Sequence, residues 1–308
     1  MHIHHLHTCT GHRGAVYTLA QAHDPRHFLS AGGDGWIVDW NLDDPDTGRL
    51  LAQTNSNLFS LCLLPGANQL VAGNMNGGIH CINLEKPDEA RLIQAHRKGV
   101  FDLKVIGNYL LSAGGDGILT WWDVETFQPK VSLQLSSASL RCIAYAPQRN
   151  ELAVGSSDNR IFFLDAGMPG LKGAIANAHG NSVFSAAYAP DGRTLITGGR
   201  DAKLKVWDAE IFGEDNIPWP GTRTPEQAAH LFTVNHITYS PDGSLFATAS
   251  RDKTIKIWDA ATCTLLKVID TIKYGGHINS VNRLLWMNQV LISAGDDRAI
   301  MLWRVETD

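Results

Sequence analysis

The stretch TASRDKTIKIWDA, residues 248–260, decides the fold, because copies of it recur along the whole chain. Residues 197–209 repeat it as TGGRDAKLKVWDA. Looser copies occupy residues 30–42, 112–124 and 293–305, and two bare outlines occupy residues 72–84 and 154–166. Seven copies with the same internal spacing indicate a repeat protein, in which each unit buries its faces against its neighbours.

The spacing within the copies is constant. Each copy has an acidic or amide residue in a tight turn: Asp34, Asn76, Asp116, Asp158, Asp201, Asp252 and Asp297. Six positions later stand Trp40, Ile82, Trp122, Leu164, Trp207, Trp258 and Trp303. Five copies add a Ser or Thr four positions before the turn residue and a His 20 or 22 positions before it. The complete sets are His12–Ser30–Asp34–Trp40, His96–Ser112–Asp116–Trp122, His179–Thr197–Asp201–Trp207, His230–Thr248–Asp252–Trp258 and His277–Ser293–Asp297–Trp303.

Between the His and the turn lies a short apolar segment such as SVFSAAYAPDGRTLIT, residues 182–197. It predicts a strand, a Pro-Asp-Gly turn and a second strand. Each copy is therefore expected to hold four short strands, and no stretch of useful length has the period of an amphipathic helix.

The His start, the turn Asp and the Trp-Asp end resemble the WD-repeat β-propeller family over nearly the whole chain. The resemblance implies an all-β fold of seven four-stranded antiparallel blades around a central channel. We expect residues 1–308 to form one propeller, with repeats at about 11–52, 53–93, 94–134, 135–176, 177–227, 228–274 and 275–308. The last repeat ends after its third strand, so residues 2–9 are predicted to supply its outer strand and close the ring.

Ser or Thr, His and Asp recurring together could suggest a catalytic triad. Five copies at fixed spacing favour a structural role, because a triad is built once. The resemblance implies that Trp bonds the Ser or Thr, which bonds the His, which bonds the turn Asp; we call each such set a structural tetrad. Repeats two and four lack this set, and we expect apolar packing around Ile82 and Leu164 to replace it.

Composition narrows the class of protein. The chain has 308 residues, of which 44% are hydrophobic and 19% charged, and its formal net charge is −5. This charge argues against nucleic-acid binding, which relies on Lys and Arg. Five scattered Cys without a CxxC pair indicate reduced thiols and a cytoplasmic protein. No segment has the pattern of a signal peptide or a membrane span, and we expect a monomer.

Two other features of the sequence bear on function. His2-x-His4 and His5-x-His7 each place two imidazoles on one face of a strand, a possible metal-ligand pair, but nothing completes the site. We therefore predict no metal and no cofactor. A longer spacing before His230 indicates a loop at residues 210–227, where Trp219 either packs on its blade or is offered to a partner.

The resemblance places the partner-binding surface on the face formed by the His and Asp turns, here called the top face. One position per repeat follows the first inward apolar residue: Tyr17, Phe59, Phe101, Arg141, Phe184, Asn235 and Asn282. The second precedes the turn residue, and its notable members are Met75, Arg200, Arg251 and Asp296.

Aromatic side chains at these positions, followed by Arg side chains, predict a non-catalytic scaffold that binds a protein or peptide with apolar and acidic residues. The alternative is that the aromatic side chains seal the channel mouth and the Arg side chains pair with neighbouring acids. A methyl-lysine or modified-peptide reader and an enzyme with a top-face active site are further alternatives.

Overall fold

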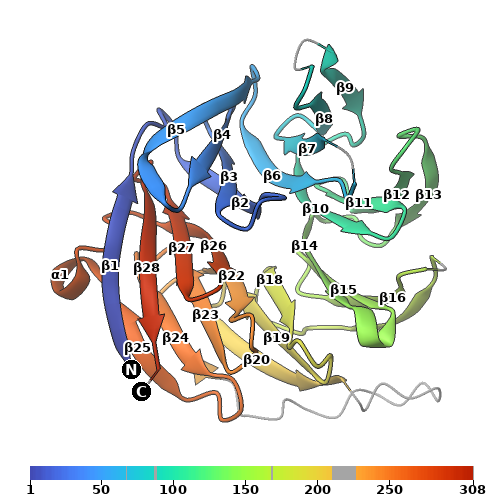
Figure 1. The fold of residues 1–308 in the computed structure, drawn as a ribbon. Coiled ribbons are helices and arrows are strands. Elements are labelled where there is room, and N and C mark those ends of the chain that lie inside the picture. The colour runs from blue at the N-terminus through green and yellow to red at the C-terminus, as the bar shows by residue number, and fades with distance from the viewer. Residues whose placement is uncertain (67, 87–88, 168, 210–226, 308) are drawn as a thin grey trace.

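Seven four-stranded antiparallel sheets stand as blades around a central axis, as the all-β prediction required (Figure 1). The computed structural model describes all residues except 67, 87–88, 168, 210–226 and 308. Blade one consists of β2 (Val16–Gln21), β3 (His27–Gly32), β4 (Trp36–Asn41) and β5 (Asp44–Gln53). Blade two consists of β6 (Leu58–Leu63), β7 (Gln69–Asn74), β8 (Gly78–Asn83) and β9 (Arg91–Gln94). Blade three consists of β10 (Val100–Ile106), β11 (Tyr109–Gly114), β12 (Ile118–Asp123) and β13 (Pro129–Gln134).

The next three blades are β14 (Leu140–Ala146), β15 (Glu151–Ser156), β16 (Ile161–Asp165) and β17 (Leu171–Ile175); β18 (Val183–Tyr188), β19 (Thr194–Gly199), β20 (Lys203–Asp208) and β21 (Gln227–Ala228); and β22 (Val234–Tyr239), β23 (Leu245–Ser250), β24 (Ile255–Asp259) and β25 (Leu265–Ile269). Blade seven is β26 (Val281–Met287), β27 (Val290–Gly295), β28 (Ile300–Glu306) and β1 (His2–Cys9). A short 3-10 turn, η2 (Pro147–Arg149), and one helical turn, α1 (Thr271–Tyr274), connect strands.

Burial falls from the inside of each blade to its outside. Strand β23 is buried at every position, because each second strand is covered by the blades on both sides. In the outer strand β25 only Ile269 is buried. This gradient explains the sequence pattern, in which second strands are almost continuously apolar or small and outer strands mix polar with apolar residues.

The hydrophobic core consists of seven separate layers, one between each pair of neighbouring blades. The layer between blades five and six, for example, joins Ile196 and Val206 to Phe246 and Trp258. Because each layer needs both of its blades, no blade can bury its apolar faces alone, which is the physical basis of the repeat architecture.

The N-terminal strand closes the ring, as predicted. Strand β1 pairs antiparallel with β28, with Ile3 opposite Val305 and Cys9 opposite Ile300. In Figure 1 the blue β1 lies beside the red β28, and both chain ends meet there. Ile3 and Cys9 are buried, so the closing strand contributes apolar area to the layers on both sides of blade seven.

The residue after the turn acid has a left-handed backbone in every blade. Blades one to three have glycine there, and Gly35 has φ +72°. Blades four to seven have Asn159, Ala202, Lys253 and Arg298 in the same conformation. The tight turn is thus one geometry repeated seven times, even where the sequence does not supply the residue that favours it.

The predicted loop at residues 210–227, and with it Trp219, lies almost entirely outside the described residues. The described part of blade five ends in the two-residue strand β21, which pairs with Lys203 and Leu204.

Candidate functional site

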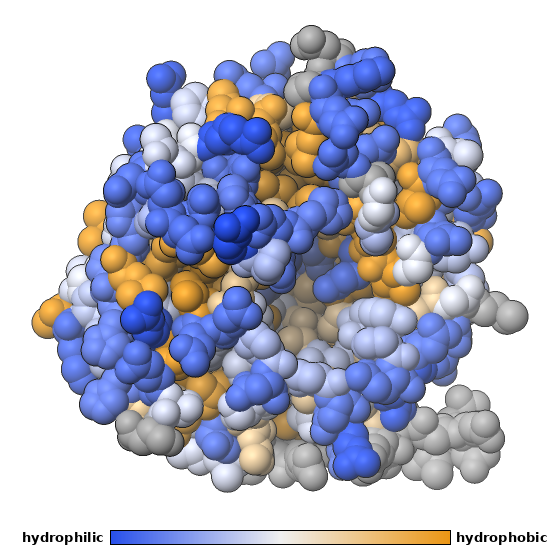
Figure 2. Space-filling view, viewed as in Figure 1, coloured by the Kyte–Doolittle hydropathy of each residue, from blue (hydrophilic) through white to orange (hydrophobic). Residues whose placement is uncertain are grey.

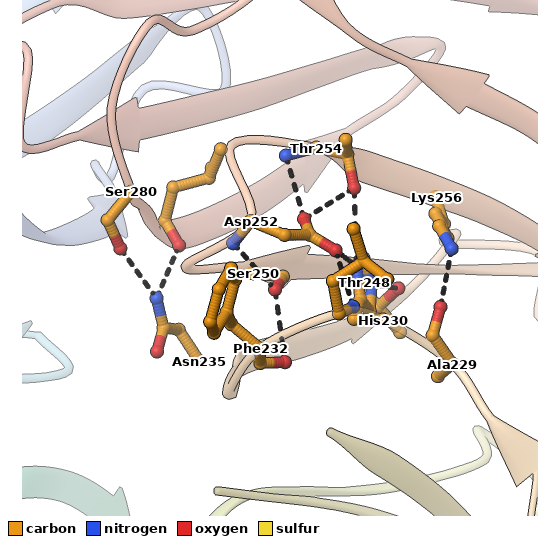
Figure 3. Close-up of polar contacts among 12 residues, drawn as sticks. Ala229, His230, Phe232, Asn235, Thr248, Ser250, Asp252, Thr254, Lys256 and Ser280 are labelled. Atoms are coloured by element: carbon orange, nitrogen blue, oxygen red, sulfur yellow. Dashed lines mark hydrogen bonds and ion pairs between the residues drawn. The ribbon is translucent and has the colours of Figure 1, made fainter. Parts of the chain in front are cut away.

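The tetrad of blade six shows how the repeated residues join, and Figure 3 labels three of its members, His230, Thr248 and Asp252. The indole Nε1 of Trp258 donates to Thr248 Oγ1 at 3.0 Å. The Thr248 hydroxyl is therefore free to donate to Nε2 of His230 at 2.7 Å, and Nδ1 of His230 donates to Asp252 at 2.9 Å. The chain of bonds connects the second and third strands of the blade to the loop that leads into its first strand.

The other four predicted sets have the same geometry. Across all five, the Trp nitrogen lies 2.8–3.0 Å from the hydroxyl oxygen. The hydroxyl oxygen lies 2.7–2.8 Å from the His Nε2, and the His Nδ1 lies 2.8–3.1 Å from the Asp. All five Ser or Thr side chains are fully buried. A hydroxyl held on both sides and shielded from solvent cannot meet a substrate, which argues for the structural role.

Electrostatics favour an ionised Asp in the tetrads and, in blades three and six, a neutral His. Burial would raise the pKa of Asp201, but the hydrogen bond and charge of His179 and two backbone N–H groups outweigh it and lower the pKa to about 2. Burial lowers the pKa of His96 and of His230 despite their Asp partners. The imidazoles therefore act as fixed hydrogen-bond links between strands.

Blades two and four do not rely on apolar packing alone, which corrects the expectation from sequence. In blade four Ser136 takes the place of the His and donates to Asp158 at 2.7 Å. In blade two Asn76 Nδ2 donates to Ser56 at 3.1 Å. Ser56 and Ser136 stand 20 and 22 residues before their turn residues, at the spacing of the missing His. A shorter side chain therefore preserves one link of the network.

In every blade, a β-bulge lies at the first of the two predicted top-face positions and changes the direction of its side chain. The register between the first and second strands slips at one residue in each: Tyr17, Phe59, Phe101, Arg141, Phe184, Asn235 and Asn282. A bulged residue is left without a partner in the ladder, so its side chain can point away from both faces of the blade.

The bulge residues contact one another around the channel mouth. The ring centroids of Tyr17 and Phe59 lie 5.3 Å apart, and those of Phe59 and Phe101 lie 5.5 Å apart. The guanidinium of Arg141 lies over the ring of Phe101 at 4.2 Å and over that of Phe184 at 5.1 Å. Burial lowers the pKa of Arg141, and the charge of Arg200 lowers it further.

The two Asn bulge residues anchor neighbouring blades. Asn235 donates from blade six to Ser280 Oγ and to the Val281 carbonyl of blade seven (Figure 3). Asn282 donates to the Val16 carbonyl of blade one at 3.0 Å. The bulge residues thus form most of a ring around the mouth, apolar on blades one to three and five, cationic on blade four and amide on blades six and seven.

The second set of predicted positions is more exposed. Met75, Arg200 and Arg251 are exposed, and neither Arg has an ion-pair partner among the described residues. Asp296 accepts a hydrogen bond from Asn282 at 2.8 Å. Arg141 donates to Ser157 at 2.7 Å and contacts aromatic rings, so it does not pair with an acid as the sealing alternative supposed.

The top face is basic although the chain is acidic. Its described loops expose nine cationic side chains: Arg13, Arg97, Lys98, Arg160, Arg200, Arg251, Lys253, Lys273 and Arg298. In the same loops Asp296 is the one exposed acid of the described residues, because the turn acids face inward to the tetrads. Negative charge is therefore concentrated on the rest of the molecule.

Sequence reasoning missed the most exposed apolar side chains of this face. Leu231, Phe232 and Ile278 lie in the loops after the tetrad His of blades six and seven, and Ile272 lies on α1; they are 83%, 57%, 62% and 98% exposed. The signal was available, because the residue after the tetrad His is apolar only in these two copies. In Figure 2, apolar areas interrupt a mainly polar surface around a central hollow.

The two N-terminal His pairs do not form one cluster. A bulge in β1 between His5 and His7 places these two side chains on opposite faces, contrary to the alternation assumed from sequence. His5 lies on the ring of Trp303 at 4.7 Å, and His7 lies 3.4 Å from Asp46. Within the described ranges no three His, Cys, Asp or Glu side chains are grouped to hold a metal ion, and no helix is long and apolar enough to cross a membrane.

Comparison with known proteins agrees with the fold and the tetrads. The family model described as WD domain, G-beta repeat matches residues 3–38, 173–208 and 222–259. The WD40 β-propeller domain of Doa1 superimposes with a TM-score of 0.84 over 99% of this chain and 98% of that chain, at 19% identity. Seven blades, five tetrads and these matches define a WD-type propeller. The three matched segments and the shared fold support its assignment to the WD-repeat β-propellers.

Relatives of known name are distant. Actin-interacting protein 1 of Caenorhabditis elegans is 28% identical over 96% of this chain and 47% of its own length. Echinoderm microtubule-associated protein-like 2 of Rattus norvegicus is 24% identical over 85% of this chain and 39% of its own length. The human serine-threonine kinase receptor-associated protein is 24% identical over 82% of this chain and 68% of its own length. The chain spans 39% to 49% of the length of four of the curated relatives it matches.

Proposed function

We propose that this chain is a non-catalytic interaction scaffold that binds a protein or peptide with apolar and acidic residues on its top face. The observation that carries the proposal is the coincidence, on that face, of exposed cations without acidic partners and of exposed apolar side chains. Arg200 and Arg251 supply the cations next to the channel mouth, and Leu231 and Phe232 supply apolar area on the neighbouring loop. Large exposed apolar side chains rimmed by charge are typical of protein-binding surfaces.

The partner is expected to be acidic because of the charge distribution. The turn Asp residues of the five tetrads are committed to His and backbone N–H groups, as Asp252 shows. Arg160 lies 3.7 Å from the turn residue Asp158, but no acid among the described residues lies within ion-pair distance of Arg200 or Arg251. A partner carboxylate would gain charge-assisted hydrogen bonds there and would be steered toward this face by its field.

A methyl-lysine reader is less well supported. Such a site needs an open aromatic cage, whereas the guanidinium of Arg141 already occupies the space between Phe101 and Phe184. A second cation would be repelled by Arg141 and by Arg200.

An enzyme with a top-face active site also has little support. The tetrad hydroxyls are buried, and burial raises the pKa of the Cys62 and Cys142 thiols to about 12, so neither presents a thiolate at neutral pH. The names of two relatives, an actin-interacting protein and a kinase receptor-associated protein, describe association with other proteins and favour the scaffold.

We also propose a monomer in the cytoplasm. The thiols of Cys9, Cys62, Cys81 and Cys142 are free in the structure, which is the state that a reducing compartment maintains.

A peptide array tests the proposal. Peptides of apolar and acidic residues, the same peptides with Lys in place of the acids, and scrambled versions are probed with the wild-type protein. We expect binding of the acidic set, and its loss in the variant Arg200→Glu/Arg251→Glu. The control Arg26→Glu/Lys130→Glu reverses the charge of two cations on the face opposite the top face, where each cation pairs with an Asp. Equal binding by both variants, with normal melting, would refute the top-face site.

A further inference from the structure

The central channel contains a cavity of about 300 Å³ that the tetrads and the top face leave unexplained. Inner strands of six blades, β2, β10, β14, β18, β22 and β26, line it. This volume is at the lower end of the range for small-ligand pockets and is large enough for an ion with a few heavy atoms.

Five of the residues that follow a bulge residue line this cavity, and three of these five bond the next blade. Asp102 accepts from the Ile143 N–H at 2.8 Å, and Ser185 accepts from the Ile237 N–H at 2.8 Å. His236 accepts from the Leu284 N–H at 3.3 Å through Nδ1. These bonds hold neighbouring inner strands together and leave the middle of the channel to longer side chains.

Arg283 departs from this pattern. It starts on blade seven and reaches to within 3.7 Å of Asp102 Oδ1 on blade three, beyond hydrogen-bond distance. Both Asp102 oxygens already accept backbone N–H groups, from Ile143 and Leu103. Among the described residues, the Arg283 guanidinium has no hydrogen-bond acceptor of its own. The single negative charge of Asp102 can balance only one positive charge in the cavity.

Lys104 adds a second cation to the same cavity. It lies two residues beyond Asp102 on β10, is partly exposed to the channel, and has no acidic partner within ion-pair distance in the described part of the chain. The adjoining walls leave room for its ammonium group, because the matching positions on β14 and β18 are Ala144 and Ala187.

The cavity therefore carries surplus positive charge. Burial lowers the pKa of His236 well below its usual value, and the charges of Arg283 and Lys104 lower it further, so both cations act on the same space. With Nδ1 accepting a backbone N–H, the neutral imidazole carries its proton on Nε2 and is a third donor. Cations in a cleft with low-dielectric walls attract anions more strongly than cations on an open surface.

We propose that the central channel binds a small oxyanion, a carboxylate or a phosphate, between Lys104, Arg283 and His236. The Arg283 guanidinium would donate to the oxyanion in a planar pair of hydrogen bonds, and the Lys104 ammonium would act as a point charge. This site lies inside the ring formed by the bulge residues, and it does not depend on the proposed top-face function.

Isothermal titration calorimetry with inorganic phosphate and, separately, malonate tests the site, with chloride holding ionic strength constant. We expect one or both to bind the wild-type protein. Lys104→Met should weaken binding about tenfold or more, the loss of one charge-assisted hydrogen bond. Lys98→Met removes an exposed cation of the top face and should leave the affinity unchanged, as should Arg200→Glu/Arg251→Glu.

Each outcome decides the question. Preference for phosphate or for malonate assigns the ligand class. Absence of heat with either probe overturns the site, and so does equal affinity in wild type and Lys104→Met. Lys104→Met leaves the Asp102 contacts intact, and Lys104→Gln serves in the same role if the Met variant fails to fold. Loss of peptide binding in Arg200→Glu/Arg251→Glu without loss of oxyanion binding separates this site from the top face.

Discussion

Replacing Thr248 by Val tests whether the tetrads stabilise the blades through hydrogen bonds and not only through packing. The substitution keeps the shape of the side chain but removes the oxygen that accepts from Trp258 Nε1 and donates to His230 Nε2. All three side chains are buried, so one donor and one acceptor are left without partners. Each unsatisfied buried group costs about 1–3 kcal/mol, and we expect a loss of about 2–4 kcal/mol in the free energy of unfolding.

The matched control is Thr248→Ser. It keeps the hydroxyl and removes one methyl group, which costs about 1 kcal/mol, and Ser occupies this position in three of the other tetrads. Guanidinium unfolding, followed by tryptophan fluorescence and circular dichroism, measures both variants. In a double-mutant cycle, the double variant Thr248→Val/Trp258→Phe should lose less free energy of unfolding than the two single variants lose together. Additive losses, or a Val variant no less stable than the Ser variant, would refute the hydrogen-bond account.

Three further predictions concern stability. Ile3→Ser should lower the free energy of unfolding by about 2–3 kcal/mol, because Ile3 is buried between blades six and seven, whereas Leu6→Ser, at an exposed site of the same strand, should change it by less than about 0.5 kcal/mol in the same unfolding assay. Ser136→Ala should cost about 1 kcal/mol by removing the substitute link of blade four, and an equal loss from the exposed Ser137→Ala would contradict this. The guanidinium midpoint should stay constant between about pH 7 and pH 8 and fall in two steps as pH decreases below this range. The first step begins near pH 6.5, because buried histidines such as His230 have lowered pKa values and the unfolded chain takes up protons first; the second begins near pH 3.8, where the turn carboxylates lose the stability that their lowered pKa values represent. A midpoint that stays level down to pH 4 would contradict the first step.

The fold could be predicted because its determinants are local in each copy. Asp252 and Trp258 stand at a fixed offset across one tight turn, and this offset survives in all seven copies even where the residue types change. Ring closure followed from the missing fourth strand of the last copy. The Ser substitutes were visible in the same spacing, at Ser56 and Ser136, but a search for His alone overlooked them.

The site was less accessible to prediction because it depends on register. Strand alternation alone does not predict the bulge that turns Phe101 toward the channel mouth, since the slip is a property of two paired strands. Nor does a linear reading join Asp102 to Arg283, which come together only when blades three and seven face each other across the channel. Contacts across a closed ring join residues that are distant in sequence and belong to different copies.

The bulges also explain how one architecture can carry different binding chemistry. A bulge residue has no partner in the ladder, so exchanging Phe59 for Arg or Asn alters the channel mouth without removing a strand–strand hydrogen bond. The tetrad residues have no such freedom, because each is joined to the next by a hydrogen bond and the Ser or Thr and the His are buried. Selection for a partner can therefore act on the bulge residues and the loops of the top face while the tetrads stay constant.

Neighbouring residues of a single inner strand also have different roles. In β10, Val100 packs in the core, Phe101 faces the mouth, and Asp102 and Lys104 face the channel. Specificity at the mouth and charge in the channel can thus change independently on a single strand, which is why we treat them as two sites.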